Sequence, residues 1–149
     1  MNMKKIAIGI LAGWALAQAG AAELDWQTDL PKAQAKAKAE NKLILLDFTG
    51  SDWCIWCKRL NDQVFSKPEF ADYAKKNLVL VEVDFPRQKE QSEALKKANQ
   101  ALQEKYKIDG FPTIIVLDGT GQKVGQLGFM PGGPKAFLAE LDKLKKKPA

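Results

Sequence analysis

The chain has 149 residues, 46% of them hydrophobic and 28% charged, with a formal net charge of +5. This length suits one domain with its own core and leaves no room for a second. The lysines at the end of the chain suit a solvated helix terminus, and the rest of the chain mixes basic and acidic residues evenly, so a nucleic-acid-binding patch is not expected.

The first 22 residues have the layout of a secretory signal peptide. A basic start, "MNMKK", precedes the apolar run "IAIGILAGWALAQAG", and "AGAAELDW" supplies small residues followed by an acid. We expect cleavage after Ala22, with Ala19 or Ala21 as alternatives, and a mature domain over 23–149. An uncleaved anchor is less favoured, because the apolar run is short for a membrane span. Export would place the protein in the periplasm, where disulfides persist.

The first half of the domain alternates helix and strand patterns. Helix formers predict a helix over Leu30–Glu40, and the apolar run "LILLDFT" (43–49) is typical of a strand buried on both faces. After the turn "GSD", a helix is expected to begin at the cysteines, with Ser51 or Asp52 as its cap. A further helix, "KPEFADYAKKN", follows a bend at Pro68.

The second half continues the alternation and ends in a hairpin. "LVLVEVDF" (78–85) predicts a second buried strand, and a long polar helix is expected over 88–107. "TIIVLD" and "KVGQLGF" flank the turn "GTGQ" as an antiparallel pair, and a helix entered at Pro134 closes the chain. This order predicts an α/β fold, a mixed four-stranded sheet with helices on both faces. The polar helix should bury one apolar side, formed by Ala94, Leu95, Ala98, Leu102 and Tyr106.

The two cysteines of the chain stand in "DFTGSDWCIWCKRL", separated by two residues. At the first turn of a helix, unpaired backbone N–H groups and the positive end of the helix dipole favour a thiolate. We therefore expect Cys54 to be an exposed nucleophile of low pKa. Cys57, one turn further and less exposed, should be the resolving thiol that releases the product.

Other uses of a cysteine pair are weaker interpretations. An inert disulfide closing so small a loop removes little entropy from the unfolded chain, so it is a poor staple. A zinc site needs four ligands, whereas this chain has no histidine and no third cysteine. A Cu(I) site on two thiolates stays open. The expected redox group is the Cys54–Cys57 disulfide itself, with no other cofactor and no metal.

Two motifs together resemble the thioredoxin superfamily: "DFTGSDWCIWCK" after a buried strand and "GFPT" before the next. The resemblance covers roughly residues 43–144. The chain is most similar to bacterial exported thioredoxin-like proteins and to the C-terminal domain of the inner-membrane thiol:disulfide interchange proteins, whose "FFDGQGQ" and "GFM" segments parallel "VLDGTGQ" and "GFM" here. The resemblance implies a thioredoxin fold and dithiol–disulfide exchange with substrate proteins.

The resemblance also implies roles for individual residues. Pro112 matches the cis-proline that faces the cysteines and, with Phe111 before it, offers backbone to an extended substrate. Asp47 matches the buried acid that exchanges protons with Cys57, and Trp53 matches the tryptophan before the first cysteine. The alternatives are a trans proline that opens a strand, a strand-end acid facing solvent, and a tryptophan that only packs.

Three departures from thioredoxin bear on function. Ile55 and Trp56 stand between the cysteines, where thioredoxin has Gly-Pro and the strong oxidant and the isomerases have a histidine. Without that histidine, a milder and more reducing couple is expected. Trp56 should lie on the surface as part of a partner-docking area, unless it folds back onto the domain. One more residue than in thioredoxin separates Asp47 from Cys54.

The favoured function is therefore an exported, monomeric thiol–disulfide oxidoreductase that reduces substrate proteins. A membrane protein is expected to supply its electrons. A periplasmic disulfide oxidase or isomerase is the first alternative, and no dimerisation segment favours the isomerase. A non-enzymatic binding or copper-handling module of the same fold is the second alternative.

Overall fold

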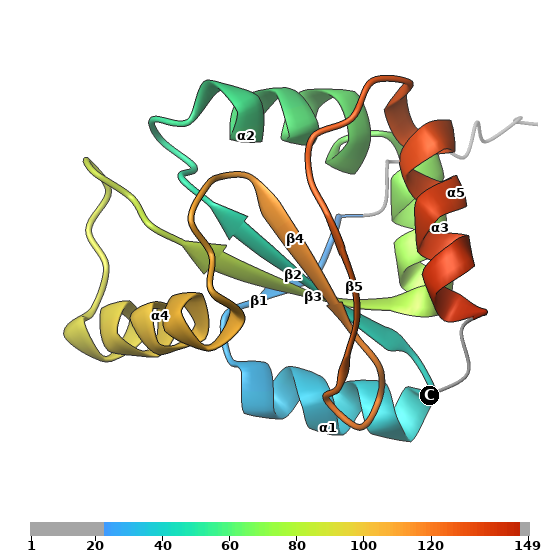
Figure 1. Cartoon of the computed structure of the whole chain (residues 1–149), viewed down its shortest axis with the longest axis horizontal. Coiled ribbons are helices and arrows are strands. Elements are labelled where there is room, and N and C mark those ends of the chain that lie inside the picture. The colour runs from blue at the N-terminus through green and yellow to red at the C-terminus, as the bar shows by residue number, and fades with distance from the viewer. Residues whose placement is uncertain (1–22, 147–149) are drawn as a thin grey trace, which may run out of the picture.

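A five-stranded mixed sheet in the order β1-β3-β2-β4-β5 forms the centre of residues 23–146, which the computed structural model describes (Figure 1). β2, β3 and β1 run parallel, whereas β4 is antiparallel to β2 and to β5. The predicted signal peptide lies outside the described residues. The strands are β1 (Trp26–Gln27), β2 (Leu43–Thr49), β3 (Leu78–Asp84), β4 (Thr113–Leu117) and β5 (Lys123–Leu127).

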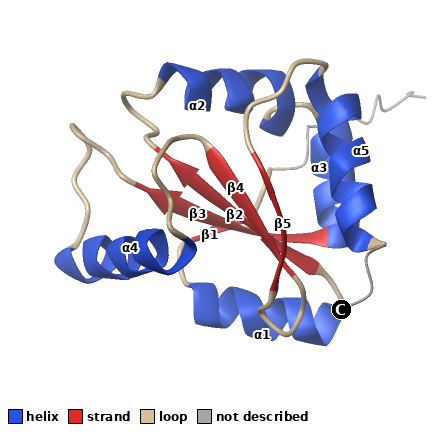
Figure 2. Cartoon of the chain, viewed as in Figure 1, coloured by secondary structure: helices blue, strands red, loops and turns tan. Residues whose placement is uncertain are grey.

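Helices cover both faces of the sheet, as Figure 2 shows. α2, α3 and α5 lie on one face, and α1 and α4 lie on the other. This α/β architecture was predicted, but with four strands, because the two residues of β1 are too short to show an alternating pattern. The helices are α1 (Leu30–Glu40), α2 (Ile55–Leu60) with a π-helical continuation (Asn61–Phe65), α3 (Pro68–Asn77), α4 (Glu93–Tyr106) and α5 (Gly133–Lys145). None of the helices in the described part of the chain combines the length and the apolar character needed to cross a membrane.

Two hydrophobic cores occupy the two faces, because side chains alternate along each strand. On β2, Leu45 belongs to the cluster that includes Phe70 of α3. Its neighbours Ile44 and Leu46 belong to the opposite cluster, with residues of α1 and α4. Asp47 is two residues beyond Leu45, so its carboxyl lies on the face that α2 covers.

Strand pairing fixes the neighbours of Asp47. Asp47 is opposite Glu82 in the parallel pair of β2 and β3, and opposite Ile114 in the antiparallel pair of β2 and β4. At the outer edge of β3, β1 pairs as far as Gln27, opposite Val81, and ends there. Glu82 is thus the first residue of β3 beyond the cover of β1.

The polar helix after β3 is shorter than predicted. The expected range was 88–107, whereas α4 spans Glu93–Tyr106 and residues 86–91 form a loop. Ser92 caps the helix, because its side chain accepts a hydrogen bond from the backbone N–H of Leu95 at 3.2 Å. The loop residues before it are bound elsewhere, as described for the site below.

The buried side of α4 also differs in part from the prediction. Ala94 and Ala98 are exposed, and the one fully buried residue of α4 is Asn99. Its side-chain amide donates a hydrogen bond to the carbonyl oxygen of Asp84 at 2.9 Å. A polar residue of α4 therefore faces the end of β3. The remaining predicted residues are half-buried: Leu95, Leu102 and Tyr106.

Candidate active site around the cysteine pair

Cys54 and Cys57 form a disulfide at the start of α2, with Cα atoms 5.3 Å apart. Cys54 is itself the N-cap of α2, and its Sγ accepts the backbone N–H of Cys57 at 3.2 Å. The predicted cap, Ser51 or Asp52, was therefore wrong, because both side chains are bound to other segments. In the reduced protein the same N–H would stabilise a thiolate on Cys54.

The two cysteines are equally covered. Each is 6% exposed, so the expected difference in exposure between Cys54 and Cys57 is not present. The Sγ of Cys54 lies 3.8 Å from the carbonyl oxygen of Phe111, which helps to cover it. The peptide bond between Phe111 and Pro112 is cis. The loop before β4 therefore lies directly against the sulfur that was expected to react.

The turn before Cys54 is tied to the end of β3. Ser51 donates from its backbone N–H and its hydroxyl to the carboxylate of Asp84, at 2.9 and 2.6 Å. The indole N–H of Trp53 donates to the carbonyl oxygen of Phe85 at 2.8 Å. Gly50 leaves the space that the Trp53 ring occupies, since a Cβ there would meet the indole. These contacts hold the turn in one conformation.

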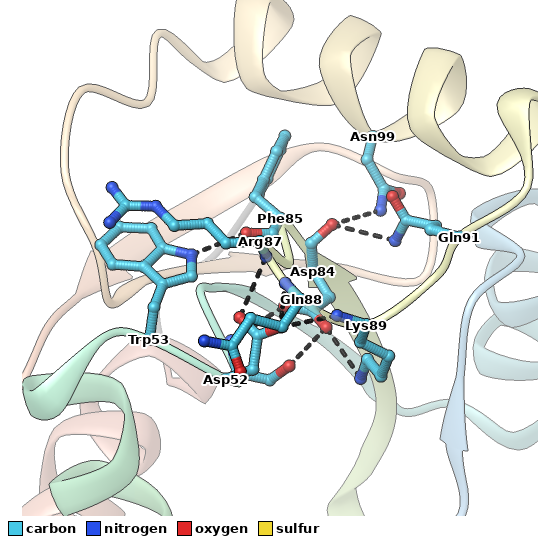
Figure 3. Close-up of polar contacts among 10 residues, drawn as sticks. Asp52, Trp53, Asp84, Phe85, Arg87, Gln88, Lys89, Gln91 and Asn99 are labelled. Carbon is cyan, nitrogen blue, oxygen red and sulfur yellow. Dashed lines mark hydrogen bonds and ion pairs between the residues drawn. The ribbon is translucent and has the colours of Figure 1, made fainter.

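Asp52 binds the loop of residues 86–91 (Figure 3). Its carboxylate accepts the backbone N–H groups of Arg87, Gln88 and Lys89 at 3.0, 2.8 and 2.9 Å. These three hydrogen bonds lower the pKa of Asp52 to about 2. They also explain why residues 87–89 are not helical, because their N–H groups point at a side chain instead of the preceding turn.

Sequence reasoning missed this network, and only the three-dimensional contacts reveal it. Lys89 continues it, with its Nζ 3.0 Å from the Asp84 carboxylate. Figure 3 also shows Arg87 beside Trp53, with the guanidinium carbon 3.8 Å from the ring centroid. A cation stacked on an aromatic face is attracted by the negative charge density of the ring. The loop thereby brings a positive charge next to the cysteine pair.

Aromatic rings surround the disulfide. Trp53 packs edge-on against Phe111 at a centroid distance of 5.9 Å, and Phe111 stacks on Phe85 at 5.2 Å. On the other side, Trp56 is 47% exposed and Ile55 is 58% exposed. Trp56 is therefore on the surface as expected.

Trp56 nevertheless has neighbours on the domain. Its ring contacts Phe129, with centroids 5.1 Å apart. The guanidinium carbon of Arg59 lies 4.7 Å from the centroid of Trp56. Each tryptophan beside the disulfide thus carries an arginine on its face, Arg87 on Trp53 and Arg59 on Trp56. The surface around the cysteines is both apolar and positively charged.

Asp47 is buried beneath this surface, with 9% of the residue exposed. The alternative of a solvent-facing acid is therefore wrong. Its Oδ1 has no hydrogen-bond partner. Burial raises the pKa of Asp47 to about 8, and the carboxyls of Glu82 and Asp84 add to the shift. A carboxyl in this state is suited to holding a proton near neutral pH.

Within residues 23–146, no group of three or more histidine, cysteine, aspartate or glutamate side chains is arranged to hold a metal ion. The group at the centre of the site that can gain and lose electrons is the Cys54–Cys57 disulfide. Reduction of this bond takes two electrons and yields two thiols.

Sequence comparison relates the chain to known proteins. Residues 30–145 match the family model described as a thioredoxin-like domain. The disulfide bond reductase DsbH of Chlamydia pneumoniae is 40% identical over 121 residues, which are 81% of this chain and 72% of that protein. The thioredoxin-related protein DsbJ of the same organism is 31% identical over 69% of this chain. The thiol:disulfide interchange protein DsbD of Klebsiella pneumoniae subsp. pneumoniae is 35% identical over 72% of it. The matched regions are 30% of DsbJ and 17% of DsbD.

Solved structures agree with the sequence matches. A structure described as DsbH oxidoreductase has a TM-score of 0.80 and 38% identity, and the match covers 91% of this chain and 96% of that one. The reduced C-terminal domain of DsbD from Neisseria meningitidis has a TM-score of 0.57 and 26% identity, with 76% and 92% covered. The family match over residues 30–145 includes strands β2 to β5, the helices and the cysteine pair.

Proposed function

Because the chain belongs to the family of thioredoxin-like domains, we propose that it is an exported reductase of protein disulfides. Its fold and its enzyme class, a thiol–disulfide oxidoreductase, are those expected from the sequence, and the matches confirm both. The direction of electron flow, the place of action and the roles of single residues are our proposal.

The proposed reaction begins with the reduced protein. The Cys54 thiolate attacks one sulfur of a substrate disulfide, and the other substrate sulfur leaves as a thiolate. Cys57 then loses its proton to the Asp47 carboxylate and attacks the Cys54 sulfur of the mixed disulfide. The Cys54–Cys57 bond forms, the second substrate sulfur leaves, and two electrons have passed to the substrate. A membrane protein would return the oxidised domain to the dithiol form.

One observation carries the assignment of the nucleophile. The Sγ of Cys54, not that of Cys57, receives the backbone N–H at the start of α2. Hydrogen bonding to the charged form of a thiol lowers its pKa and raises its thiolate fraction. Cys57 lies one turn further along α2, whose buried residues are Cys57 and Leu60.

We assign substrate binding to the surface formed by Trp53, Trp56, Phe111 and Pro112. Trp56 and Ile55 supply exposed apolar area, which marks protein-binding sites when it is concentrated. The backbone carbonyl of Phe111 lies beside Cys54, which supports pairing of this loop with an extended segment of the substrate. Arg59 and Arg87 on the tryptophan faces favour acidic residues near the substrate disulfide.

Two observations favour a reductase: the residues between the cysteines and the name of a similar protein. Ile55 and Trp56 offer no imidazole to stabilise the reduced form, so the Cys54–Cys57 couple should be only weakly oxidising. The relative with 40% identity carries the name disulfide bond reductase. The signal-like start of the chain supports export to the periplasm.

The direction of the reaction is tested by the reduction potential. The mature protein is equilibrated with dithiothreitol buffers, and the Cys54–Cys57 disulfide is quantified. A potential near about −270 mV supports a reductase, whereas one near about −120 mV marks an oxidant and overturns the proposed direction.

The cysteine roles are tested with insulin as the disulfide substrate. Cys54→Ser should lose insulin reduction and form no mixed disulfide. Cys57→Ser should also stop turnover but accumulate a mixed disulfide through Cys54, visible by non-reducing electrophoresis. Thermal unfolding of both variants controls for folding. Retained activity in Cys54→Ser, or trapping by that variant instead, would overturn the assignment.

A further inference from the structure

Asp47 lacks an evident way to exchange protons with water. Its Oδ1 is buried without a hydrogen-bond partner, and helices α2, α3 and α5 cover the face of the sheet on which it lies. If Asp47 takes the proton of Cys57, it must release that proton before the next cycle. We propose that Glu82 is the positioning residue that carries protons between Asp47 and solvent, through a pocket at the β1 edge of the sheet. This inference rests on the function proposed above.

The register of the sheet brings the two carboxyls together. Asp47 and Glu82 are direct partners in the parallel pair of β2 and β3, and neighbouring strands lie about 4.8 Å apart. Partners in this pairing project to the same face, so both side chains lie on the side of α2. On the opposite flank, the β4 partner of Asp47 is the apolar Ile114, which offers no proton acceptor.

Glu82 reaches the surface where Asp47 does not. It is half-buried and lines an open pocket of about 280 Å³, together with Thr28 and Lys89. The pocket exists because β1 ends at Gln27, opposite Val81, and leaves the next position of β3 without a neighbouring strand. Water in this pocket can meet the Glu82 carboxyl without passing the cysteines.

The surroundings of Glu82 shift its affinity for protons in the same direction as that of Asp47. Burial raises the pKa of Glu82, the Asp84 carboxylate raises it further, and Lys89 opposes the shift. The Asp84 carboxylate is engaged by the Ser51 hydroxyl and by Lys89, so Glu82 is the carboxyl beside Asp47 that can exchange a proton with it. From α4, Leu95 and Asn99 line the pocket and bring no charge. A raised pKa moves a carboxyl towards neutral pH, where general acid–base groups work best.

The pocket lies apart from the proposed substrate-binding surface, so protons could leave while a substrate is bound. The residues that line it include none of those assigned to substrate binding. A protein substrate that covers Trp53, Trp56 and Phe111 would therefore leave the pocket open. In the resolving step the proton passes from Cys57 to Asp47, from Asp47 to Glu82, and from Glu82 to water, while the electron pair of the Cys57 thiolate forms the new disulfide bond.

The test is multiple-turnover reduction of insulin at neutral pH, with dithiothreitol as the electron source, because each new cycle requires Asp47 to have released its proton. Glu82→Gln keeps the size of the side chain but cannot carry a proton. We expect its rate to fall by about tenfold, less than the 10²–10⁴-fold typical of a general base itself. Glu82→Asp should recover most of the rate. Added formate, a small acid that can enter the pocket, should speed Glu82→Gln and leave Asp47→Asn unchanged.

Two further variants separate a relay from a general effect of charge or folding. Glu90→Gln removes an exposed carboxylate from the same pocket and should react like the wild type. The double variant Asp47→Asn/Glu82→Gln should be no slower than Asp47→Asn alone, because the relay needs both groups.

The inference is overturned if Glu82→Gln reacts like the wild type while Asp47→Asn is slow. It is equally overturned if Glu82→Gln slows the Asp47→Asn background, if formate has no effect, or if Glu90→Gln shows the same loss. Loss of the proposed function has a different signature, because Cys54→Ser would then still reduce insulin.

Discussion

Gly50 lies so close to the Trp53 indole that a side chain does not fit between them. Gly50→Ala should therefore displace the indole from the Phe85 carbonyl and from Arg87. We expect a higher KM for insulin and a smaller change in kcat, because the binding surface moves while the sulfurs remain. Gly110→Ala is the matched control, since a Cβ there meets nothing within 4 Å. Equal kinetics in the two variants would contradict the role given to Trp53.

Among the individual residues, the sequence predicted those that belong to a local motif. The two cysteines and the exposed Trp56 follow from the strand–turn–helix pattern around "DFTGSDWCIWC", whereas the burial of Asp47 was implied by the resemblance to the thioredoxin superfamily. Glu82 and Asp52 could not be predicted this way. The first depends on the register between two strands far apart in sequence, and the second on the conformation of a loop.

The turn that carries Asp52 and the loop of residues 86–91 behave as one element. Asp52→Ala removes the acceptor of three backbone N–H groups. We expect the amide hydrogens of residues 87–89 to exchange about tenfold faster or more, because in the wild type these hydrogen bonds must break before exchange can occur. Since the pKa of Asp52 is lowered to about 2, wild-type protection should persist at mildly acidic pH and fail only as the pH approaches that value.

The control for this prediction is Asp72→Ala, which removes an exposed carboxylate from α3. Hydrogen exchange measured by mass spectrometry should show no change near residues 87–89 in that variant. Unchanged exchange in Asp52→Ala would mean that the loop is held by Lys89 and Gln91 instead, through their contacts with Asp84.

Element boundaries were predictable where the pattern was local and strong. Apolar runs marked β2 and β3, and Pro31 and Pro68 lie at the starts of α1 and α3. The start of α4 was misplaced, because the polar residues before Ser92 suit a helix by propensity while tertiary hydrogen bonds hold them in a loop.

For the whole molecule, buried Asp47 makes stability depend on pH. Its pKa is about 8 in the folded protein and near 3.9 in an unfolded chain. Between these values the folded state keeps a proton that the unfolded state has released, so the free energy of unfolding falls as the pH rises from about 4 to about 8. Four pKa units at about 1.4 kcal/mol each set an upper limit of roughly 6 kcal/mol.

Urea unfolding of the oxidised protein at about pH 5 and about pH 8 measures this decline. Asp47→Asn has no proton to release at this site, so its stability should fall less over the same range. Part of the slope should remain, because the pKa of Glu82 is also raised. Parallel curves for the wild type and the variant would show that Asp47 is ionised in the folded state throughout.

The chain contains no histidine, and in the oxidised protein both cysteines are bonded to each other. Few groups are then left to titrate near neutral pH besides Asp47 and the terminal amine. The oxidised protein is consequently a poor buffer where it works. In lightly buffered solution containing a pH indicator, each proton that crosses the protein surface during reduction becomes visible as a colour change, without any label.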